Sequence, residues 1–347
     1  MKKLITPISG KEVFVGHDVQ TDAIILALES SCDETACAIV KNGREVLTNV
    51  VASQIKTHKQ FGGVVPEVAA REHLEAVNSV IDEAFSTSGI KPEELTAIAA
   101  TAGPGLAGSL LVGLNAAKTL SMVYDKPFIG INHLNAHVCA NYIGTDLEPP
   151  FTALLVSGGH TQIIKVKSYS ESEILGETID DAAGEAFDKV ARLIGLSYPG
   201  GVNLDKLAPQ GNPNAFSFTP ARVGEFDFSF SGLKTAVLHL TQKLYERDGK
   251  LPEADIAASF REHITSILLK KTVKAARKFG MTKIVLAGGV AANSLLREKF
   301  NNLKNEGFEI YIPEMKYCTD NAAMVGSCAY FHDDVLTSMA TEVFSRA

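Results

Sequence analysis

The hydrophobic pattern of the chain switches repeatedly between short apolar runs and longer segments with helical spacing. In the first half, three runs of strand length come first, and a helix, a strand, a helix and a strand follow. The predicted strands are IILALE (24–29), ACAIV (36–40), EVLTNVVA (45–52), LTAIAATA (95–102) and KPFIGI (126–131), and the predicted helices cover 66–85 and 103–123.

The second half repeats this order with one insertion. Its predicted strands are FTALLVS (151–157), TQIIKV (161–166), SEILGE (172–177), KIVLAGG (283–289) and FEIYIP (308–313), and its predicted helices cover 180–195, 254–279 and 291–300. Asp180 or Asp181 is placed to cap the first of these helices. The sequence therefore predicts an N-terminal extension (1–22), a first lobe (23–145) and a second lobe (146–347), with a polar insertion at about 196–255.

Composition fits a two-domain α/β protein. The chain has 347 residues, 46% hydrophobic residues and 28 glycines. No apolar run approaches the roughly 20 residues that a membrane span needs. The first residues match the pattern of a signal peptide or a mitochondrial presequence poorly. Five cysteines form no CxxC pair, which favours reduced thiols in a cytoplasmic protein with no membrane partner.

The net charge of −7 counts against a protein that binds nucleic acid through bulk charge. One local exception is a stripe on the predicted helix 254–279, formed by Lys270, Lys274, Arg277 and Lys278. The simplest interpretation of this stripe is a solvated helix face, and it gains interest only if nucleic acid is implicated by other residues.

NHLNAH (132–137) places His133 and His137 four residues apart, on one face of a helix. A zinc peptidase of the H-E-x-x-H type would carry its glutamate base at position 134, where this chain has Leu134. Asp320 follows the last strand of the second half as His133 follows that of the first. The three side chains converge if the halves face each other, and two histidines with one carboxylate suit Fe(II), or zinc. The alternative is that Thr319 or Asp320 only caps the last helix.

Three glycine turns are suited to close approach by a phosphate or a carbonyl oxygen. They are SGGHT (157–161), YPGG (198–201) and AGGVAANS (287–294). Together, in a duplicated α/β chain, they indicate a nucleotide-binding site. The chain has no Walker A lysine motif and no GxGxxG after its first strand, so neither a P-loop nor a Rossmann site is supported.

A dense series of motifs covers residues 24–335. In order, they are ESSCDET, FGGVVPE, TAGPGLAGSLLVG, NHLNAH, LLVSGGHTQ, DDAAGEAFDK, YPGG, FDFSFSGLKT, LAGGVAAN and CTDNAAM. With them the chain resembles the bacterial tRNA N6-adenosine threonylcarbamoyltransferases, formerly called O-sialoglycoprotein endopeptidases or glycoproteases. The resemblance implies a duplicated α/β fold of the actin-like and sugar-kinase-like (ASKHA) class, with RNase H-like halves and a cleft between two lobes.

The same resemblance implies roles for individual residues. The implied metal ligands are His133, His137 and Asp320, and the implied substrate or nucleotide contacts are Leu155, Val156, Ser157, Gly158, Gly159, Asp188, Gly201, Asp205 and Asn293. Leu155 stands where archaeal relatives have a metal-ligating tyrosine, so water or substrate would complete the coordination. Residues 1–22 precede the usual start of the family.

The implied reaction moves a threonylcarbamoyl group from threonylcarbamoyl-AMP to N6 of adenosine-37 in tRNAs that read codons starting with adenine. Candidates for a general base are Asp33, Glu34 and His160, although Asp33 and Glu34 alternatively only shape a hairpin turn. Fe(II) is the favoured metal, with zinc or magnesium as alternatives. The implied partners are tRNA, a shorter paralogous subunit of the same fold and a P-loop ATPase. A metallopeptidase and an ATP-binding actin-like module remain as rival hypotheses.

Overall fold

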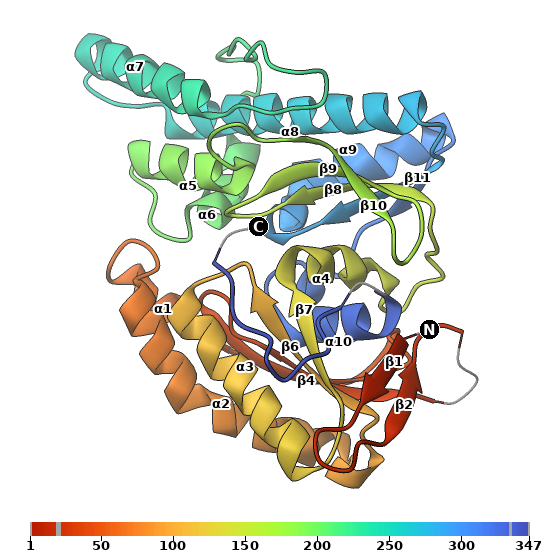
Figure 1. Cartoon of the computed structure of the whole chain (residues 1–347). Helices are drawn as coiled ribbons and strands as arrows, with labels where there is room; N and C mark the ends of the chain where they lie inside the picture. The colour runs from red at the N-terminus through yellow and green to blue at the C-terminus, as the bar shows by residue number, and fades with distance from the viewer. Residues whose placement is uncertain (1, 19–21, 333–334, 346–347) are drawn as a thin grey trace. The chain divides into compact units, whose positions relative to one another are not determined.

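The computed structural model describes residues 2–18, 22–332 and 335–345, and their contacts divide the chain into two compact units (Figure 1). Unit 1 comprises Met1–Glu148 and Pro313–Ala347, and unit 2 comprises Pro149–Ile312. The sequence assigned 313–347 to the second lobe, and this assignment is wrong because the last helix packs on the sheet of unit 1. Residues 1 and 19–21 of the predicted extension lie outside the described residues.

The sheet of unit 1 has the strand order β5-β4-β3-β6-β7. Its strands are β3 (Ile24–Glu29), β4 (Glu34–Lys41), β5 (Glu45–Ser53), β6 (Ala97–Gly103) and β7 (Phe128–Asn132). β3, β4 and β5 form antiparallel pairs, whereas β6 runs parallel to β3 and to β7. Each predicted strand of the first half is present. β3 and β6 are almost wholly buried, as expected of central strands covered on both faces.

Helices cover both faces of this sheet. They are α1 (Ile55–Lys59), α2 (Pro66–Ser88), α3 (Ala107–Val123), α4 (His133–Cys139) and α10 (Ala322–Phe331). α2 begins with a proline in its first turn and ends at Gly89, whose φ of 68° is left-handed. α2 and α3 lie side by side on one face (Figure 1), and α10 packs against β3 and β4.

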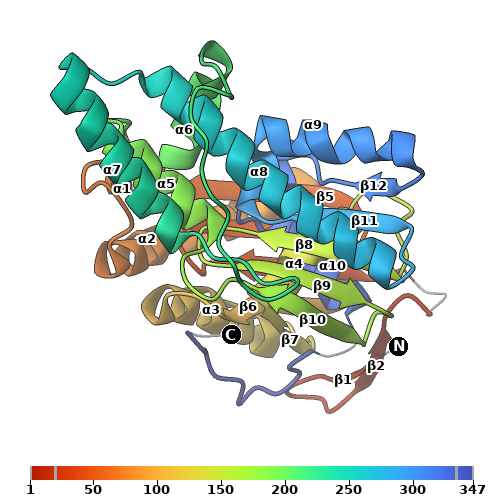
Figure 2. The ribbon, with the colours of Figure 1, turned by 90° about the horizontal axis from the view of Figure 1, so that it is seen from above.

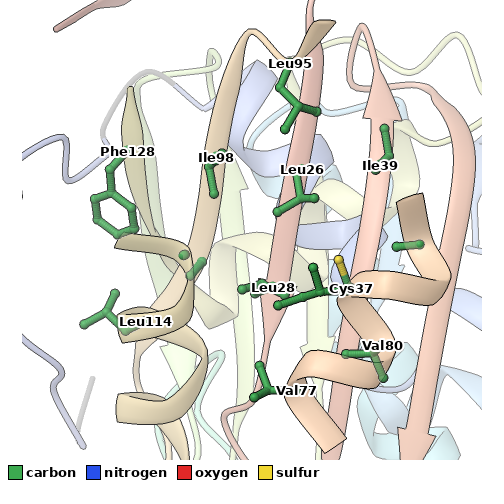
Figure 3. Close-up of a cluster of buried hydrophobic side chains, with 14 of the residues drawn as sticks. Leu26, Leu28, Cys37, Ile39, Val77, Val80, Leu95, Ile98, Leu114 and Phe128 are labelled. Atoms are coloured by element: carbon green, nitrogen blue, oxygen red, sulfur yellow. The ribbon is translucent and has the colours of Figure 1, made fainter. Parts of the chain in front are cut away.

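The core between the sheet and the helices α2 and α3 is built from aliphatic side chains at strand and helix spacing (Figure 3). Leu26 and Leu28 of β3 point to the same side because strand residues alternate. Val77 and Val80 of α2 belong to the same cluster, and Phe128 of β7 completes it (Figure 3). Burying such side chains supplies about 1.5–3 kcal/mol each, so this core holds the ends of β3 and β7 in place.

The N-terminal extension forms a hairpin, β1 (Lys2–Ile5) paired with β2 (Glu12–Val15). The buried Lys2 ammonium donates to the carbonyl oxygens of Ala329 and Tyr330, at 2.6 and 3.1 Å. These carbonyls belong to the last turn of α10, where a positive charge is favourable. Asp125 accepts hydrogen bonds from the backbone of Ile8 and Ser9. The extension therefore fastens the C-terminal end of α10 within unit 1.

The sheet of unit 2 has the order β10-β9-β8-β11-β12, which repeats the order of unit 1. Its strands are β8 (Phe151–Val156), β9 (Thr161–Val166), β10 (Ser172–Glu177), β11 (Lys283–Ala287) and β12 (Glu309–Tyr311). The first three are antiparallel neighbours, and β11 runs parallel to β8 and to β12. The duplicated pattern predicted from the sequence is confirmed, including SEILGE as a strand.

The helices of unit 2 are α5 (Ala183–Leu193), α6 (Gly200–Leu207), α7 (Ser231–Asp248), α8 (Glu253–Lys278) and α9 (Ser294–Asn302). α8 contacts β8 and lies beside α9 (Figure 2). The polar insertion at 196–255 contains α6 and α7. Among the described residues, no helix is long and apolar enough to cross a membrane.

The predicted capping of α5 by Asp180 or Asp181 is wrong. The N-cap of α5 is Ala182, with no side-chain cap. Asp180 instead accepts hydrogen bonds from the backbone of Phe230 and Ser231, at 2.7 and 3.3 Å. It therefore satisfies free N–H groups at the start of α7, a helix distant in sequence, while Asp181 pairs with Lys189 of α5.

Candidate functional site

The two histidines of NHLNAH lie in the short helix α4, directly after β7. The side chain of Asn132 caps α4 by accepting from the backbone N–H of Leu134 and Asn135, at 2.9 and 3.3 Å. The helix therefore starts at His133, and His137 follows one turn later on the same face. Their rings are 4.6 Å apart between centroids and nearly perpendicular.

Asp320 lies immediately before α10. Asn321, and neither Thr319 nor Asp320, is the N-cap, because its side chain accepts from the backbone of Met324 at 3.0 Å. The capping interpretation of Thr319 and Asp320 is therefore wrong. One oxygen of Asp320 lies 3.5 Å from Nε2 of His133 and 3.2 Å from Nε2 of His137.

The predicted convergence of these three residues is confirmed, but its expected cause is not. All three belong to unit 1, so the carboxylate reaches the histidines within one unit. One ligand atom of each lies within 4.8 Å of the others. Two imidazole nitrogens and one carboxylate oxygen aimed at one point suit a divalent transition-metal ion.

Glu29 contacts His133, and this residue was not singled out from the sequence. This carboxylate is buried. Its Oε2 lies 3.2 Å from Nδ1 of His133 and accepts from the Thr101 hydroxyl at 2.5 Å, while Oε1 accepts from the backbone of Ser31 at 2.6 Å. A proton on Nδ1 of His133 leaves Nε2 for an ion, as in many metal sites. The available signal was an acidic residue closing the apolar strand IILALE.

The charged groups of this cluster shift one another's pKa values. Burial alone lowers the pKa of His133, but the Glu29 and Asp320 carboxylates raise it to about 9. Burial raises the pKa of Asp320, yet His133 and His137 lower it to about 2. Glu29 also has a lowered pKa, since His133 outweighs its burial.

A cation fits the residues present. Nε2 of both histidines faces the same carboxylate oxygen, as expected of three ligands that share one cation. Nδ1 of His137 is buried, and no hydrogen-bond partner for it is found among the described residues. The donor set and its carboxylate support behind His133 agree with the metal role implied by the resemblance.

Asp33 lies in the turn between β3 and β4, and Glu34 follows it as the first residue of β4, also in unit 1. Asp33 is buried, and Glu34 accepts from the Ser53 hydroxyl at 3.2 Å. Burial, followed by the Asp320 and Asp33 carboxylates, raises the pKa of Glu34 to about 9. The turn therefore lies within electrostatic range of the candidate metal ligand Asp320.

The SGGHT turn joins β8 to β9 in unit 2. The backbone N–H of Ser157 donates to the carbonyl of His160 at 2.8 Å, and the N–H of His160 donates to the Ser157 hydroxyl at 3.1 Å. A Cβ at Gly158 or Gly159 would meet no atom within 4 Å, so these two residues leave open space for a ligand. The N–H of Gly184, in the first turn of α5, donates to the carbonyl of Ser157 at 3.2 Å.

Leu155 and Val156 precede this turn on β8, and their side chains are fully buried. The Leu155 side chain is core, so it cannot take the ligand role of the archaeal tyrosine. Gly288, after β11, has a φ of 89°, and a Cβ there would lie 2.4 Å from the carbonyl oxygen of Val156. Two strand ends thus approach as closely as only glycine permits.

The remaining predicted nucleotide contacts form two small clusters in unit 2. Asp188 of α5 accepts from the backbone N–H of Gly201 in α6 at 2.8 Å, which joins DDAAGEAFDK to YPGG. Asp205 of α6 accepts from the Asn293 amide at 2.9 Å and from Arg261 at 2.8 Å. The carboxylates that were expected to bind substrate therefore also connect helices.

Replacing Asp205 with alanine is expected to destabilise the protein by about 3 kcal/mol. Arg261 is largely buried and would lose its carboxylate partner, and breaking such a pair typically costs 3–5 kcal/mol. Thermal unfolding followed by calorimetry measures the loss. Asp248→Ala breaks an exposed pair with Arg247 and should change the melting temperature little. Equal effects in the two variants would contradict a structural role for Asp205.

The basic stripe of α8 is mostly paired. Lys274 and Lys278 both bind Glu225, and Arg277 binds Glu306. The two carboxylates offset half of the four positive charges of the stripe. This agrees with the simpler interpretation, a solvated helix face, and gives the stripe weak support as a tRNA-binding patch.

Solved structures share the fold. Full-length HypF in its phosphate- and nucleotide-bound form has a TM-score of 0.60 at 15% identity, over 89% of this chain and 46% of HypF. Component A of the (R)-2-hydroxyglutaryl-CoA dehydratase of Acidaminococcus fermentans has a TM-score of 0.50 at 16% identity, over 90% of this chain and 98% of that chain. The chain is thus a duplicated α/β protein of the actin-like and sugar-kinase-like class, and it carries a candidate metal site.

Sequence comparison defines the family. The profile of TsaD, tRNA N6-adenosine threonylcarbamoyltransferase, matches residues 45–327. A Clostridium perfringens protein of that name is 52% identical over 312 residues, which are 89% of this chain and 92% of the relative. A Clostridium botulinum protein of the same name is 53% identical over 311 residues, 88% of this chain and 92% of that relative. The chain belongs to this family of tRNA-modifying transferases, and a metallopeptidase is not favoured.

Proposed function

We propose that this chain transfers the threonylcarbamoyl group from threonylcarbamoyl-AMP to N6 of adenosine-37 in tRNAs that read codons starting with adenine. The observation that carries the proposal is the convergence of His133, His137 and Asp320, supported by Glu29, in a chain of this family. A bound ion would supply Lewis acidity toward the carbamoyl carbonyl or the phosphate. Fe(II) suits the two-histidine, one-carboxylate set best; zinc is the next choice, and magnesium prefers oxygen ligands.

The reaction is an acyl transfer. N6 attacks the carbamoyl carbon and a C–N bond forms; the bond from that carbon to the phosphate oxygen breaks, and AMP leaves with the electron pair. The donor is a mixed anhydride, so the enzyme chiefly needs to position it and to stabilise developing charge. The backbone N–H groups of Gly158 and Gly159 are suited to hold donor oxygens, because open space surrounds them.

The adenosine part of the donor binds to the residues of unit 2 that link its helices: Asp188, Gly201, Asp205 and Asn293. Leu155 and Val156 can contribute only through their backbone, since their side chains are buried. Asp205 and Asn293 are hydrogen-bonded to each other at 2.9 Å. A ribose hydroxyl would join this existing polar pair without new side-chain ordering.

The attacking amine must lose a proton, and Glu34 is our first choice of acceptor, with Asp33 and His160 as alternatives. The Asp320 carboxylate contributes to the raised pKa of Glu34. A cation bound to Asp320 would offset its negative charge and lower the pKa of Glu34. Glu34 would then be more often deprotonated and able to accept a proton. His160 lies in the SGGHT turn of unit 2 and is half-buried.

The proposed partners are inferred from the family resemblance and from the net charge of the chain. With a net charge of −7 and a basic stripe that is largely paired, the chain offers little bulk attraction for RNA. We therefore propose that a shorter paralogous subunit and a P-loop ATPase supply part of the tRNA contact, in the cytoplasm. The target base must leave the anticodon-loop stack to react, as in other base-modifying enzymes.

The test is threonylcarbamoyl transfer in vitro. The chain, its partner subunits and Fe(II) are incubated without oxygen with threonylcarbamoyl-AMP and unmodified tRNA, and the digested tRNA is examined by mass spectrometry. Formation of N6-threonylcarbamoyladenosine is expected. ATP turnover without tRNA product would contradict the proposal and favour an ATP-driven actin-like module instead.

A further inference from the structure

His73 is a buried histidine of α2 that contacts the turn between β3 and β4. Its Nδ1 lies 2.7 Å from the Thr35 hydroxyl, and its Nε2 lies 3.0 Å from the carbonyl oxygen of Cys32. The ring therefore bridges the two ends of the four-residue turn that carries Asp33 and Glu34. Nothing in the sequence distinguished His73 from other polar positions of the predicted helix 66–85.

The contacts of His73 define its protonation. A carbonyl oxygen only accepts, so Nε2 carries the proton that it donates to Cys32. Nδ1 is then the acceptor for the Thr35 hydroxyl. Burial lowers the pKa of His73, which favours this neutral form. A neutral ring with one donor and one acceptor matches both partners, so both of its polar atoms are satisfied without a net charge.

A second buried residue, Gln54, also holds this turn. The backbone N–H of Gln54 donates to the carbonyl of Asp33 at 3.0 Å. The Gln54 amide is itself fixed, because its oxygen accepts from His58 at 3.0 Å and its nitrogen donates to the carbonyl of Ala69 at 3.3 Å. His58, Gln54 and His73 are all buried. A simple strand connection does not need several satisfied buried polar groups, whereas a rigid one does.

We propose that His73 is a positioning residue for the transfer reaction, which fixes the Cys32–Thr35 turn and thereby the carboxylates of Asp33 and Glu34. This inference rests on the role proposed above for that turn. Small displacements of reacting groups cost up to about 100-fold in rate. Two hydrogen bonds from one ring, at both ends of the turn, limit such displacements more than either bond alone.

The first experiment compares His73→Leu with His73→Gln in the metal-loaded full chain with its partner subunits. Leucine removes both hydrogen bonds, and kcat should fall roughly 10- to 100-fold, with metal content and the KM for tRNA unchanged. Glutamine offers one donor and one acceptor and should restore kcat to within a few-fold of wild type. Thr35→Val keeps the shape but removes one bond, and should give an intermediate loss even if His73→Leu folds poorly. Glu75→Gln, on an exposed position of α2, is the control.

A double-mutant cycle with Glu34→Gln separates positioning from general stability. If His73 acts through the turn, His73→Leu should add little further loss in the Glu34→Gln background. Full additivity, or an unchanged kcat in both His73→Leu and Thr35→Val, would overturn the positioning role. Normal activity of Glu34→Gln alone would instead refute the proposed role of the turn, and with it the positioning role of His73.

Discussion

Replacing His133 with alanine is expected to lower the rate of threonylcarbamoyl transfer at least 100-fold and to remove the bound metal. His133 supplies one of three ligand atoms that lie within 4.8 Å of one another, and alanine leaves only two. A Lewis acid typically contributes several kcal/mol to the transition state, which corresponds to a factor of 100 to 1,000 or more. The measurements are metal content by elemental analysis and product by mass spectrometry of digested tRNA.

The matched control is His239→Ala, which removes an exposed imidazole of α7 in unit 2. It should keep both metal and activity. Asp320→Asn tests the third ligand, since the amide keeps the size of the side chain but loses its negative charge. A His133→Ala protein that transfers at the wild-type rate would show that these residues serve another purpose.

Replacing Glu29 with glutamine is expected to weaken metal binding 10- to 100-fold, although Glu29 does not belong to the converging triad. Its Oε2 is 3.2 Å from Nδ1 of His133, and the amide would no longer offer a negative charge there. The pH dependence should change as well. Metal binding requires the neutral imidazole, so the affinity of the wild type should rise with pH and level off near the His133 pKa of about 9.

Without the Glu29 carboxylate, the pKa of His133 falls, and the affinity should level off at a lower pH. Competition for Zn²⁺ against a chromophoric chelator, between about pH 6 and 9.5, measures both effects. Glu83→Gln, an exposed position of α2, is the control. An unchanged affinity and an unchanged pH profile together would show that Glu29 does not support the metal.

The fold was predictable from the sequence because the hydrophobic pattern of each segment identified it as a strand or a helix. Runs such as IILALE and FTALLV are continuous and short, as buried strands are, and the order of elements occurs twice. The assignment of the last helix failed for a physical reason: α10 is buried along its whole length, so its composition does not indicate which sheet it covers.

The candidate site was predictable only in part. His133 and His137 are four residues apart, and helical spacing alone predicts that they share a face. Glu29 is distant in sequence from His133, and His73 is distant from Cys32 and Thr35. Only the folded chain brings these residues into contact. Asp180 was misjudged because a carboxylate near one helix start can bond to the start of another. Such long-range hydrogen bonds leave no periodic trace in a single sequence.

The interrupted sequence of unit 1 has a consequence for synthesis and truncation. Two of the candidate metal ligands, His133 and His137, precede unit 2 in the chain, and the third, Asp320, follows it. On the ribosome, unit 2 is therefore complete before the metal centre can form, and the centre becomes complete only when Asp320 has emerged. A chain that ends at residue 312 would keep every strand of both sheets, yet it would lack the carboxylate. Bound metal would thus indicate a chain that extends at least to Asp320.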